Sequence, residues 1–129
     1  MIGYVLLGTN DNERANAFYD ALMPVIGAKR VMAFPGAVVW GISPTVPSLG
    51  VTKPHDGKPA TFGNGTMVAI VVNKRSLVDA MHAKALELGG KDEGAAGLRG
   101  DDGPNAFYAG YFRDLDGNKL CVFKVGPAD

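Results

Sequence analysis

Residues 10–27 read NDNERANAFYDALMPVIG, and they predict a helix with one buried face. Three residues can cap its start, because their side chains accept hydrogen bonds from the free amides of a first turn: Asn10, Asp11 and Asn12. Apolar residues then recur at steps of three and four, as on the buried stripe of a helix: Ala15, Phe18, Leu22 and Val25. Pro24 disfavours helical geometry at Met23, and Gly27 ends the segment.

Short apolar stretches that favour β-strands flank this helix. One precedes it, at residues 4–7, and three follow it, at residues 29–33, 37–42 and 49–52. Pro35-Gly36 separates the first two of these three, and residues 43–47, which include two prolines, separate the second pair. The first part of the chain therefore has the predicted order strand, helix, strand, strand, strand.

The pattern begins again after a connector rich in Gly, Pro, Lys and Asp. Residues 67–72 predict a strand, and Asn73 is positioned to cap a second helix that ends at Gly89-Gly90. A shift of 63 residues aligns four identical pairs: Val5 with Val68, Asn10 with Asn73, Ala17 with Ala80, and Gly27 with Gly90. This internal repeat predicts one domain, residues 1–129, made of a first module (1–53), a linker (54–65) and a second module (66–129).

A hairpin ends the second module. Residues 106–113 and 119–125 predict its strands, and residues 114–118, DLDGN, predict its turn. A calcium loop of the EF-hand type is excluded, because the position of its bidentate Glu holds Val125. Residues 92–104 are rich in glycine, and we do not expect all of them to be regular.

Composition excludes several classes of function. Thirteen basic and thirteen acidic side chains leave no formal net charge, so we expect no nucleic-acid partner and no anionic membrane partner. Cys121 is the single cysteine, which rules out an intrachain disulfide and argues against a cysteine-based zinc site. No apolar run reaches the roughly 18 residues that a spanning helix needs. We expect a cytoplasmic protein.

Three segments resemble the vicinal oxygen chelate superfamily, the glyoxalase and bleomycin-resistance group. Residues 10–20, NDNERANAFYD, resemble its first-helix signature, and residues 63–69, GNGTMVA, resemble the opening of its second module. Residues 114–118 resemble its closing D-P-D-G-N turn, with Leu115 in place of proline. The resemblance covers nearly the whole chain. It implies an α+β fold in which two tandem βαβββ modules form a curled mixed sheet around a cavity, with the helices outside.

The resemblance also implies four metal-ligand positions, one on the first and one on the last strand of each module. In metal-using members the ion binds two neighbouring substrate oxygens and acts as a Lewis acid. Three positions fall on Tyr4, Met67 and Cys121, and the fourth falls within residues 48–51, which offer no good ligand. His55 lies in the linker, and we expect His82 to face solvent. We therefore expect no metal and no cofactor.

Without an ion, the cavity is expected to be lined by apolar and aromatic side chains: Tyr4, Leu6, Trp40, Met67, Ala69, Tyr111 and Cys121. Tyr111 corresponds to a position at which fosfomycin-resistance relatives carry a tyrosine that contacts substrate. Strand alternation places Tyr111 and Cys121 on one face, together with Arg113 and Lys119, if the turn has five residues. The opposite phase selects Tyr108 instead, and the sequence leaves both phases open.

Two functions remain. The first is a metal-free protein that binds a small, partly apolar molecule in the inter-module cavity. The second is a metal-independent lyase or isomerase that uses Tyr4 or Tyr111 as acid, base or hydrogen-bond donor. A lysine or arginine close to either hydroxyl favours the enzyme, and a purely apolar lining favours the binder. Because relatives commonly dimerise, we also expect a homodimer.

Overall fold

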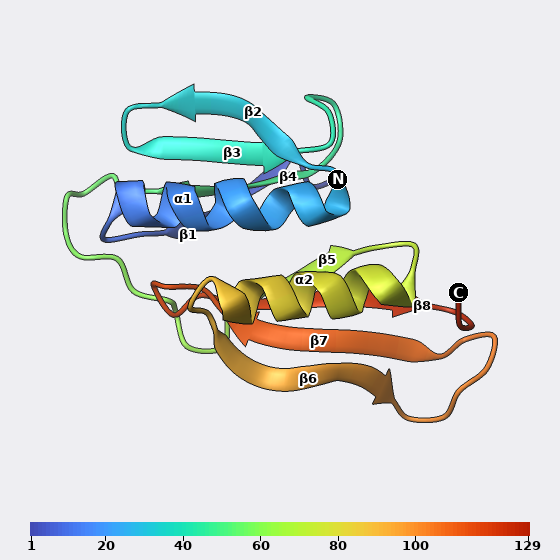
Figure 1. Ribbon diagram of the computed structural model, residues 1–129. Helices are drawn as coiled ribbons and strands as arrows, with labels where there is room; N and C mark the ends of the chain where they lie inside the picture. The colour runs from blue at the N-terminus through green and yellow to red at the C-terminus, as the bar shows by residue number, and fades with distance from the viewer.

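The computed structural model describes residues 1–129, and the order βαβββ occurs in it twice (Figure 1). The first module consists of β1 (Tyr4–Gly8), α1 (Asn12–Leu22), a short 3₁₀ helix η1 (Met23–Ile26), β2 (Lys29–Phe34), β3 (Ala37–Gly41) and β4 (Ser48–Thr52). The second consists of β5 (Met67–Val71), α2 (Arg75–Glu87), β6 (Lys91–Arg99), β7 (Phe107–Arg113) and β8 (Lys119–Val125). The α+β fold and the tandem modules predicted from the sequence are confirmed.

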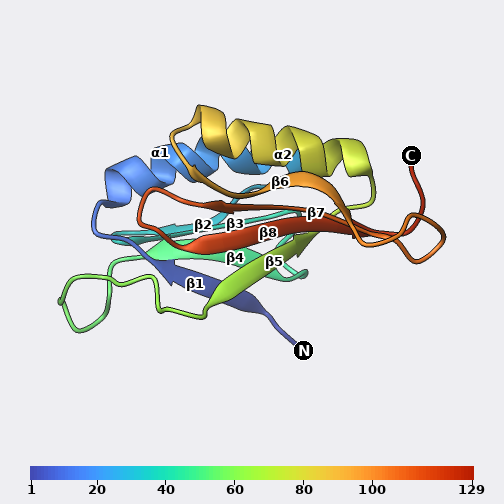
Figure 2. The ribbon, with the colours of Figure 1, turned by 90° about the horizontal axis from the view of Figure 1, so that it is seen from below.

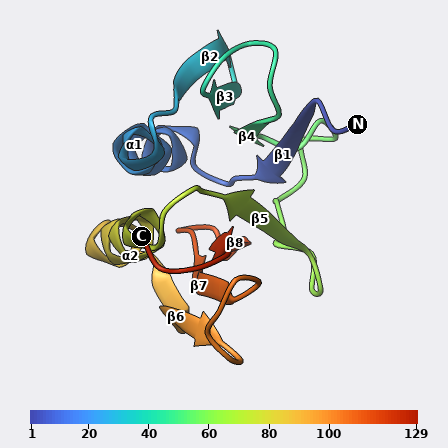
Figure 3. The same cartoon turned by 90° about the vertical axis from the view of Figure 1, so that its right-hand side faces the viewer.

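Each module forms its own four-stranded mixed sheet, in the orders β1-β4-β3-β2 and β5-β8-β7-β6. The β1–β4 and β5–β8 pairs are parallel, and the remaining pairs are antiparallel. The two sheets are not hydrogen-bonded to one another, so they do not close into a barrel. Figures 2 and 3 show β1 and β5 side by side at the junction, with α1 and α2 side by side on one face of the sheets. Neither helix is long and apolar enough to cross a membrane.

The core lies between the two helices and the two sheets. Alternate residues of β1 and β5 point into it, because successive side chains of a strand point to opposite faces. Val5 and Leu7 therefore pack under the helices, and so do Val68 and Ile70. The core is continuous from α1 to α2, so the modules share one apolar interior although their sheets stay separate.

The two helices begin in different ways. Asp11 caps α1, accepting a hydrogen bond from the amide of Arg14 at 3.0 Å, so one of the three predicted capping residues has this role. The expectation for Asn73 is wrong, because α2 begins at Arg75 and its N-cap residue, Lys74, makes no side-chain cap. The Asp129 carboxylate instead accepts hydrogen bonds from the amides of Arg75 and Ser76. These bonds lower the pKa of Asp129 to about 2.

The glycine-rich segment after α2 forms a strand as far as Arg99, while residues 100–106 lie outside any strand. The pairing of β6 with β7 shifts register on both sides of Gly94, so β6 is bulged. The expectation that His82 faces solvent is wrong. Its ring is buried, its Nε2 lies 3.1 Å from an Asp92 carboxylate oxygen, and Gly110 leaves the space into which it packs.

Candidate functional site

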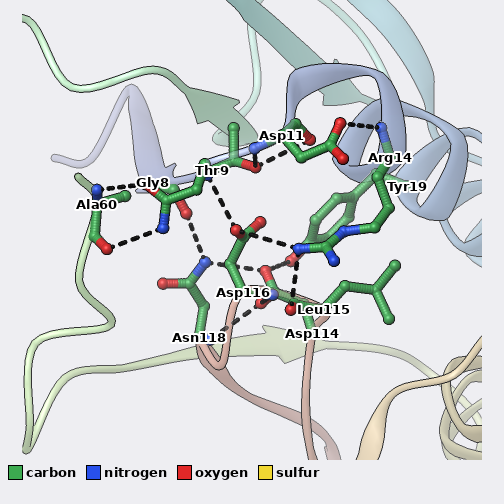
Figure 4. Close-up of polar contacts among 11 residues, drawn as sticks. Gly8, Thr9, Asp11, Arg14, Tyr19, Ala60, Asp114, Leu115, Asp116 and Asn118 are labelled. Carbon is green, nitrogen blue, oxygen red and sulfur yellow. Dashed lines mark hydrogen bonds and ion pairs between the residues drawn. The ribbon is translucent and has the colours of Figure 1, made fainter. Parts of the chain in front are cut away.

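The residues that carry the sequence signatures meet where the second module touches the first (Figure 4). The Asp114 carboxylate is buried and accepts four hydrogen bonds. The Tyr19 hydroxyl donates one at 2.7 Å, the Asn118 side chain one at 3.0 Å, and the amides of Asp116 and Asn118 one each at 2.9 Å. Burial raises the pKa of Asp114, against the opposing effect of these donors. It also raises the pKa of Tyr19, together with the charge of Asp114.

Further bonds from this turn reach β1 and the start of α1. The Asn118 side chain donates to the carbonyl of Gly8 at 2.9 Å, and the Asp116 carboxylate accepts from the amide of Asn10 at 3.0 Å. Arg14 donates to the carbonyl of Leu115 at 3.3 Å. We call these groups the inter-module network, defined as Asn10, Arg14, Tyr19, Asp114, Asp116 and Asn118. Its polar atoms bond to one another, so these signature residues join the modules.

The other face of the two sheets, turned away from the helices, carries the candidate site. We call it the open face. Tyr4 and Leu6 of β1 and Met67, Ala69 and Val71 of β5 alternate with the core residues of their strands, and all five are exposed. Since β1 and β5 lie side by side (Figure 3), the face that they share receives residues of both modules.

The structure places the sequence-predicted site residues on this side of the sheets, with one exception, although Cys121 is buried there and only 1% exposed. Cys121 pairs with Ala69 on one side and Tyr111 on the other, so the three form a row across β5, β8 and β7. Trp40 is the exception. Its ring is 1% exposed, packs against Tyr19 in the core, and donates to Asp20 of α1 at 2.9 Å. It lies on the helix side of the first sheet, so its expected place in the cavity lining is wrong.

The structure also resolves the choice between the two tyrosines of β7. Tyr108 points to the helix side, where its hydroxyl donates to Asp79 of α2 at 2.6 Å. Tyr111 lies on the open face, between the guanidinium of Arg99 at 5.4 Å and the ammonium of Lys119 at 5.8 Å from its ring centroid. Sequence reasoning missed Arg99, because it follows a glycine-rich run without the periodicity from which a face could be assigned.

Neither Tyr111 nor Cys121 is arranged as a base or nucleophile. Burial raises the pKa of Tyr111, and the neighbouring Cys121 raises it further. Burial also raises the pKa of the Cys121 thiol, although Tyr111, Arg99 and Lys119 act in the opposite direction. At neutral pH both groups therefore keep their protons, and Tyr111 is suited to donate a hydrogen bond.

The residues at the four metal-ligand positions that the resemblance implies are a poor match for a divalent ion. The register pairs Leu6 with Gly50 and Ala69 with Cys121, and Leu6 and Ala69 are related by the 63-residue repeat. Gly50 is therefore the counterpart of Cys121 and occupies the fourth position, where it has no side chain. The other three hold a phenol, a thioether and a buried thiol, a poor set for hard ions. No group of three His, Cys, Asp or Glu side chains is arranged so that it could hold a metal ion.

A shallow hollow marks the first-module part of the open face. It has a volume of about 170 Å³, and its lining includes Tyr4, Met32 and Ser48. This volume is below the roughly 300 Å³ at which small-molecule pockets begin. The open face of a single chain is thus a surface rather than a closed cavity.

Comparison with solved structures identifies the relatives of this chain. A glyoxalase/bleomycin resistance protein from Albidiferax ferrireducens T118 is 34% identical, with a TM-score of 0.85 over 96% of this chain and 98% of its own. A glyoxalase/bleomycin resistance protein/dioxygenase family enzyme from Burkholderia phytofirmans PsJN is 17% identical, with a TM-score of 0.71 over 95% and 97%.

A lactoylglutathione lyase from Agrobacterium tumefaciens is 22% identical, with a TM-score of 0.65 over 96% of this chain and 92% of its own. The last two likenesses show the fold alone. No family model and no curated protein matches the sequence. The identity, coverage and fold shared with the Albidiferax protein nevertheless place this chain in the glyoxalase/bleomycin resistance protein family, within the vicinal oxygen chelate superfamily.

Proposed function

We propose that the protein binds a small, partly apolar molecule on its open face without a metal ion. The observation that carries this proposal is the exposure of large apolar side chains from both modules on one face. Tyr4 is 59% exposed, Leu6 42% and Met67 43%. Contiguous exposed apolar residues of this kind mark binding sites in soluble proteins. The lack of a fitting donor set supports the metal-free form of the proposal.

We further propose that a second copy of the chain covers this face and closes the site. Phe34 and Val71 support it, because they extend the exposed apolar surface along the first and second sheets, at 61% and 68% exposure. Sedimentation at micromolar concentration should give twice the chain mass, and Val71→Asp should give a monomer. A monomeric wild-type protein would contradict the proposal that a second copy covers the open face. A cytoplasmic location stays a prediction from the sequence.

The experiment for binding is a screen of small aromatic and aliphatic compounds, read as a rise in melting temperature and confirmed by calorimetry. It is run after dialysis against a chelator, because the proposal requires binding without a metal. Leu6→Gln should abolish the rise. The matched control is Leu98→Gln, because Leu98 is 39% exposed but pairs with Tyr108, on the helix side of the second sheet. Binding that needs an added metal ion, or equal loss in both variants, would refute the proposal.

The cations that flank Tyr111 favour a second candidate, a metal-independent lyase or isomerase. Because the pKa of Tyr111 is raised, its hydroxyl would act as a hydrogen-bond donor to a developing oxyanion and not as a base. The test is turnover of α-hydroxycarbonyl compounds by chelator-treated protein. Tyr111→Phe should lower kcat while leaving the melting temperature unchanged, and unchanged kcat would exclude this role.

A further inference from the structure

The open face differs in charge between its two modules. On the first sheet, the exposed side chains of β1 beside the junction are apolar, as at Leu6, and the exposed Met32 of the outer strand β2 is apolar too. On the second sheet, Arg99, Arg113 and Lys119 lie on the same face as Tyr111 and Cys121. The chain has no net charge, so this group of cations is a local feature.

The bulge in β6 fixes the position of the Arg99 guanidinium. Arg99 donates to the carbonyls of Ala95 at 2.7 Å and Gly97 at 2.9 Å. A Cβ at Gly94 would lie 3.2 Å from Nη2 of Arg99 and 3.1 Å from the Tyr111 ring, so glycine leaves the space that the guanidinium occupies. The cation is thus held beside Tyr111 by the backbone of its own strand.

Arg99 and Lys119 form no ion pair with a carboxylate, although other cations of the chain do. The hydrogen bond from Arg113 lowers the pKa of Glu93, and the charges of Lys91 and Lys119 lower it further. Glu93 is bound to Arg113, at 2.6 Å from the guanidinium. The positive charges of Arg99 and Lys119 therefore remain available, on either side of a neutral phenol and a neutral thiol.

Cationic side chains beside an apolar surface recognise a particular kind of ligand. Arginine and lysine donate charge-assisted hydrogen bonds to carboxylates, and these bonds are about twice as strong as neutral ones. Tyr111 and Ala69 are separated by two strand spacings, about 10 Å. A molecule with an acid group over Tyr111 would thus place a body of one or two rings on β5 and β1.

We propose that the ligand is an amphipathic organic carboxylate, which rests on the proposed binding function and specifies its chemistry. Arg99 and Lys119 bind the carboxylate, and the Tyr111 hydroxyl donates to it. The apolar body lies over Ala69 and reaches Leu6 and Met67. The unequal charge of the two modules sets the orientation of the ligand across the junction.

The test compares naphthalene-2-carboxylate with 2-naphthamide, which has the same shape and no charge, by calorimetry at 20 and 300 mM NaCl. The carboxylate should bind about tenfold more tightly at low salt, from one charge-assisted hydrogen bond. The preference should shrink at high salt, because salt screens exposed charges. Arg99→Gln and Lys119→Gln should each remove most of it. Lys84→Gln on α2 should leave it unchanged.

Arg99→Gln also removes the bonds that hold the β6 bulge, so Lys119→Gln, which leaves the bulge intact, provides the independent result. Equal affinity of wild-type protein for the two compounds would overturn the carboxylate assignment and leave the binding function standing. A Lys119→Gln variant that keeps the full preference would overturn the same assignment. Binding of neither compound, in a protein whose compound screen also gives no hit, would overturn both proposals.

Discussion

The inter-module network and the open face are built in opposite ways. In the network, Asp114 is buried and four hydrogen bonds satisfy its carboxylate. On the open face, Tyr4, Leu6 and Met67 are apolar side chains that stay about half exposed. The network contains residues of the first-helix and closing-turn motifs, whereas the open face contains only Met67 and Ala69 from the third motif, residues 63–69. The first-helix and closing-turn motifs therefore maintain the architecture, and most of the side chains available to select a ligand lie outside all three motifs.

Removing Asp114 from the inter-module network should have the largest effect on stability. Asp114→Ala leaves the Tyr19 hydroxyl and the two amides of the turn without an acceptor in the interior. We expect a loss of about 4 kcal/mol in the free energy of unfolding, because the donors that bonded to Asp114 would stay buried without a hydrogen-bond partner. Urea denaturation measures this loss. Asp101→Ala, at an exposed position, should change stability little, and equal effects of the two variants would contradict a structural role for the network.

Removing a single donor should have a smaller effect. Tyr19→Phe keeps the aromatic packing against Phe18 and Trp40 and deletes only the hydroxyl that bonds to Asp114 at 2.7 Å. The loss should be about 1.5 kcal/mol, the value of a hydrogen bond to a charged group. In the Asp114→Ala background the same change should cost less, because its partner is already absent. Additive effects in this double-mutant cycle would show that the two groups do not interact.

The network should also respond to pH. The pKa of Asp114 is raised in the folded state, so its ionised form is less favourable there than in the unfolded chain. The protonated Asp114 side chain therefore makes its full contribution to stability below the usual aspartate pKa of the unfolded chain. This contribution is lost as pH rises through the raised pKa of the folded state. Comparing the free energies of unfolding of wild type and Asp114→Asn from pH 3 to 7 measures this contribution. As pH rises, the free energy of unfolding of the wild type should fall relative to that of Asp114→Asn. A relative rise would contradict a raised pKa.

The open face should show the smallest effect on folding. Leu6→Ala changes an exposed side chain, and the free energy of unfolding of the monomer should move by less than about 0.5 kcal/mol. Its neighbour Leu7 is the matched control, because it is buried in the core on the same strand. Leu7→Ala should cost about 3 kcal/mol. Similar losses at the two leucines would mean that the monomer buries both faces of β1, and the open face would not differ from the core.

Much of the fold could be predicted from local patterns. The period of α1 and the turn at residues 114–118 depend on neighbours in the sequence, and both occur as predicted. The cap of α1 was predicted as one of three residues, and the structure selects Asp11. The strand β6 was harder to predict, because its glycines carry no apolar pattern and it pairs with β7 through bulges. The cap of α2 could not be found locally, since Asp129 lies more than 50 residues from the amides that it binds.

The candidate site was predictable only in part, and Trp40 shows why. Val38, Val39 and Trp40 are all buried, so the sequence of β3 contains no alternation that would assign Trp40 to a face. His82 presented the opposite difficulty, since its polar ring is buried in a space that exists only because Gly110 lies beneath it. Arg99 reaches Tyr111 only because the bulge in β6 has glycine there.

The sequence by itself determined the two modules and their order, because repeats and helical periods are local properties. Only the tertiary structure decided which face each side chain occupies and which residues from different modules meet. Strand register and module packing are set by contacts between residues far apart in the chain, and a one-residue change of register moves a side chain to the opposite face. The network around Asp114 and the row from Tyr111 to Ala69 exist for that reason.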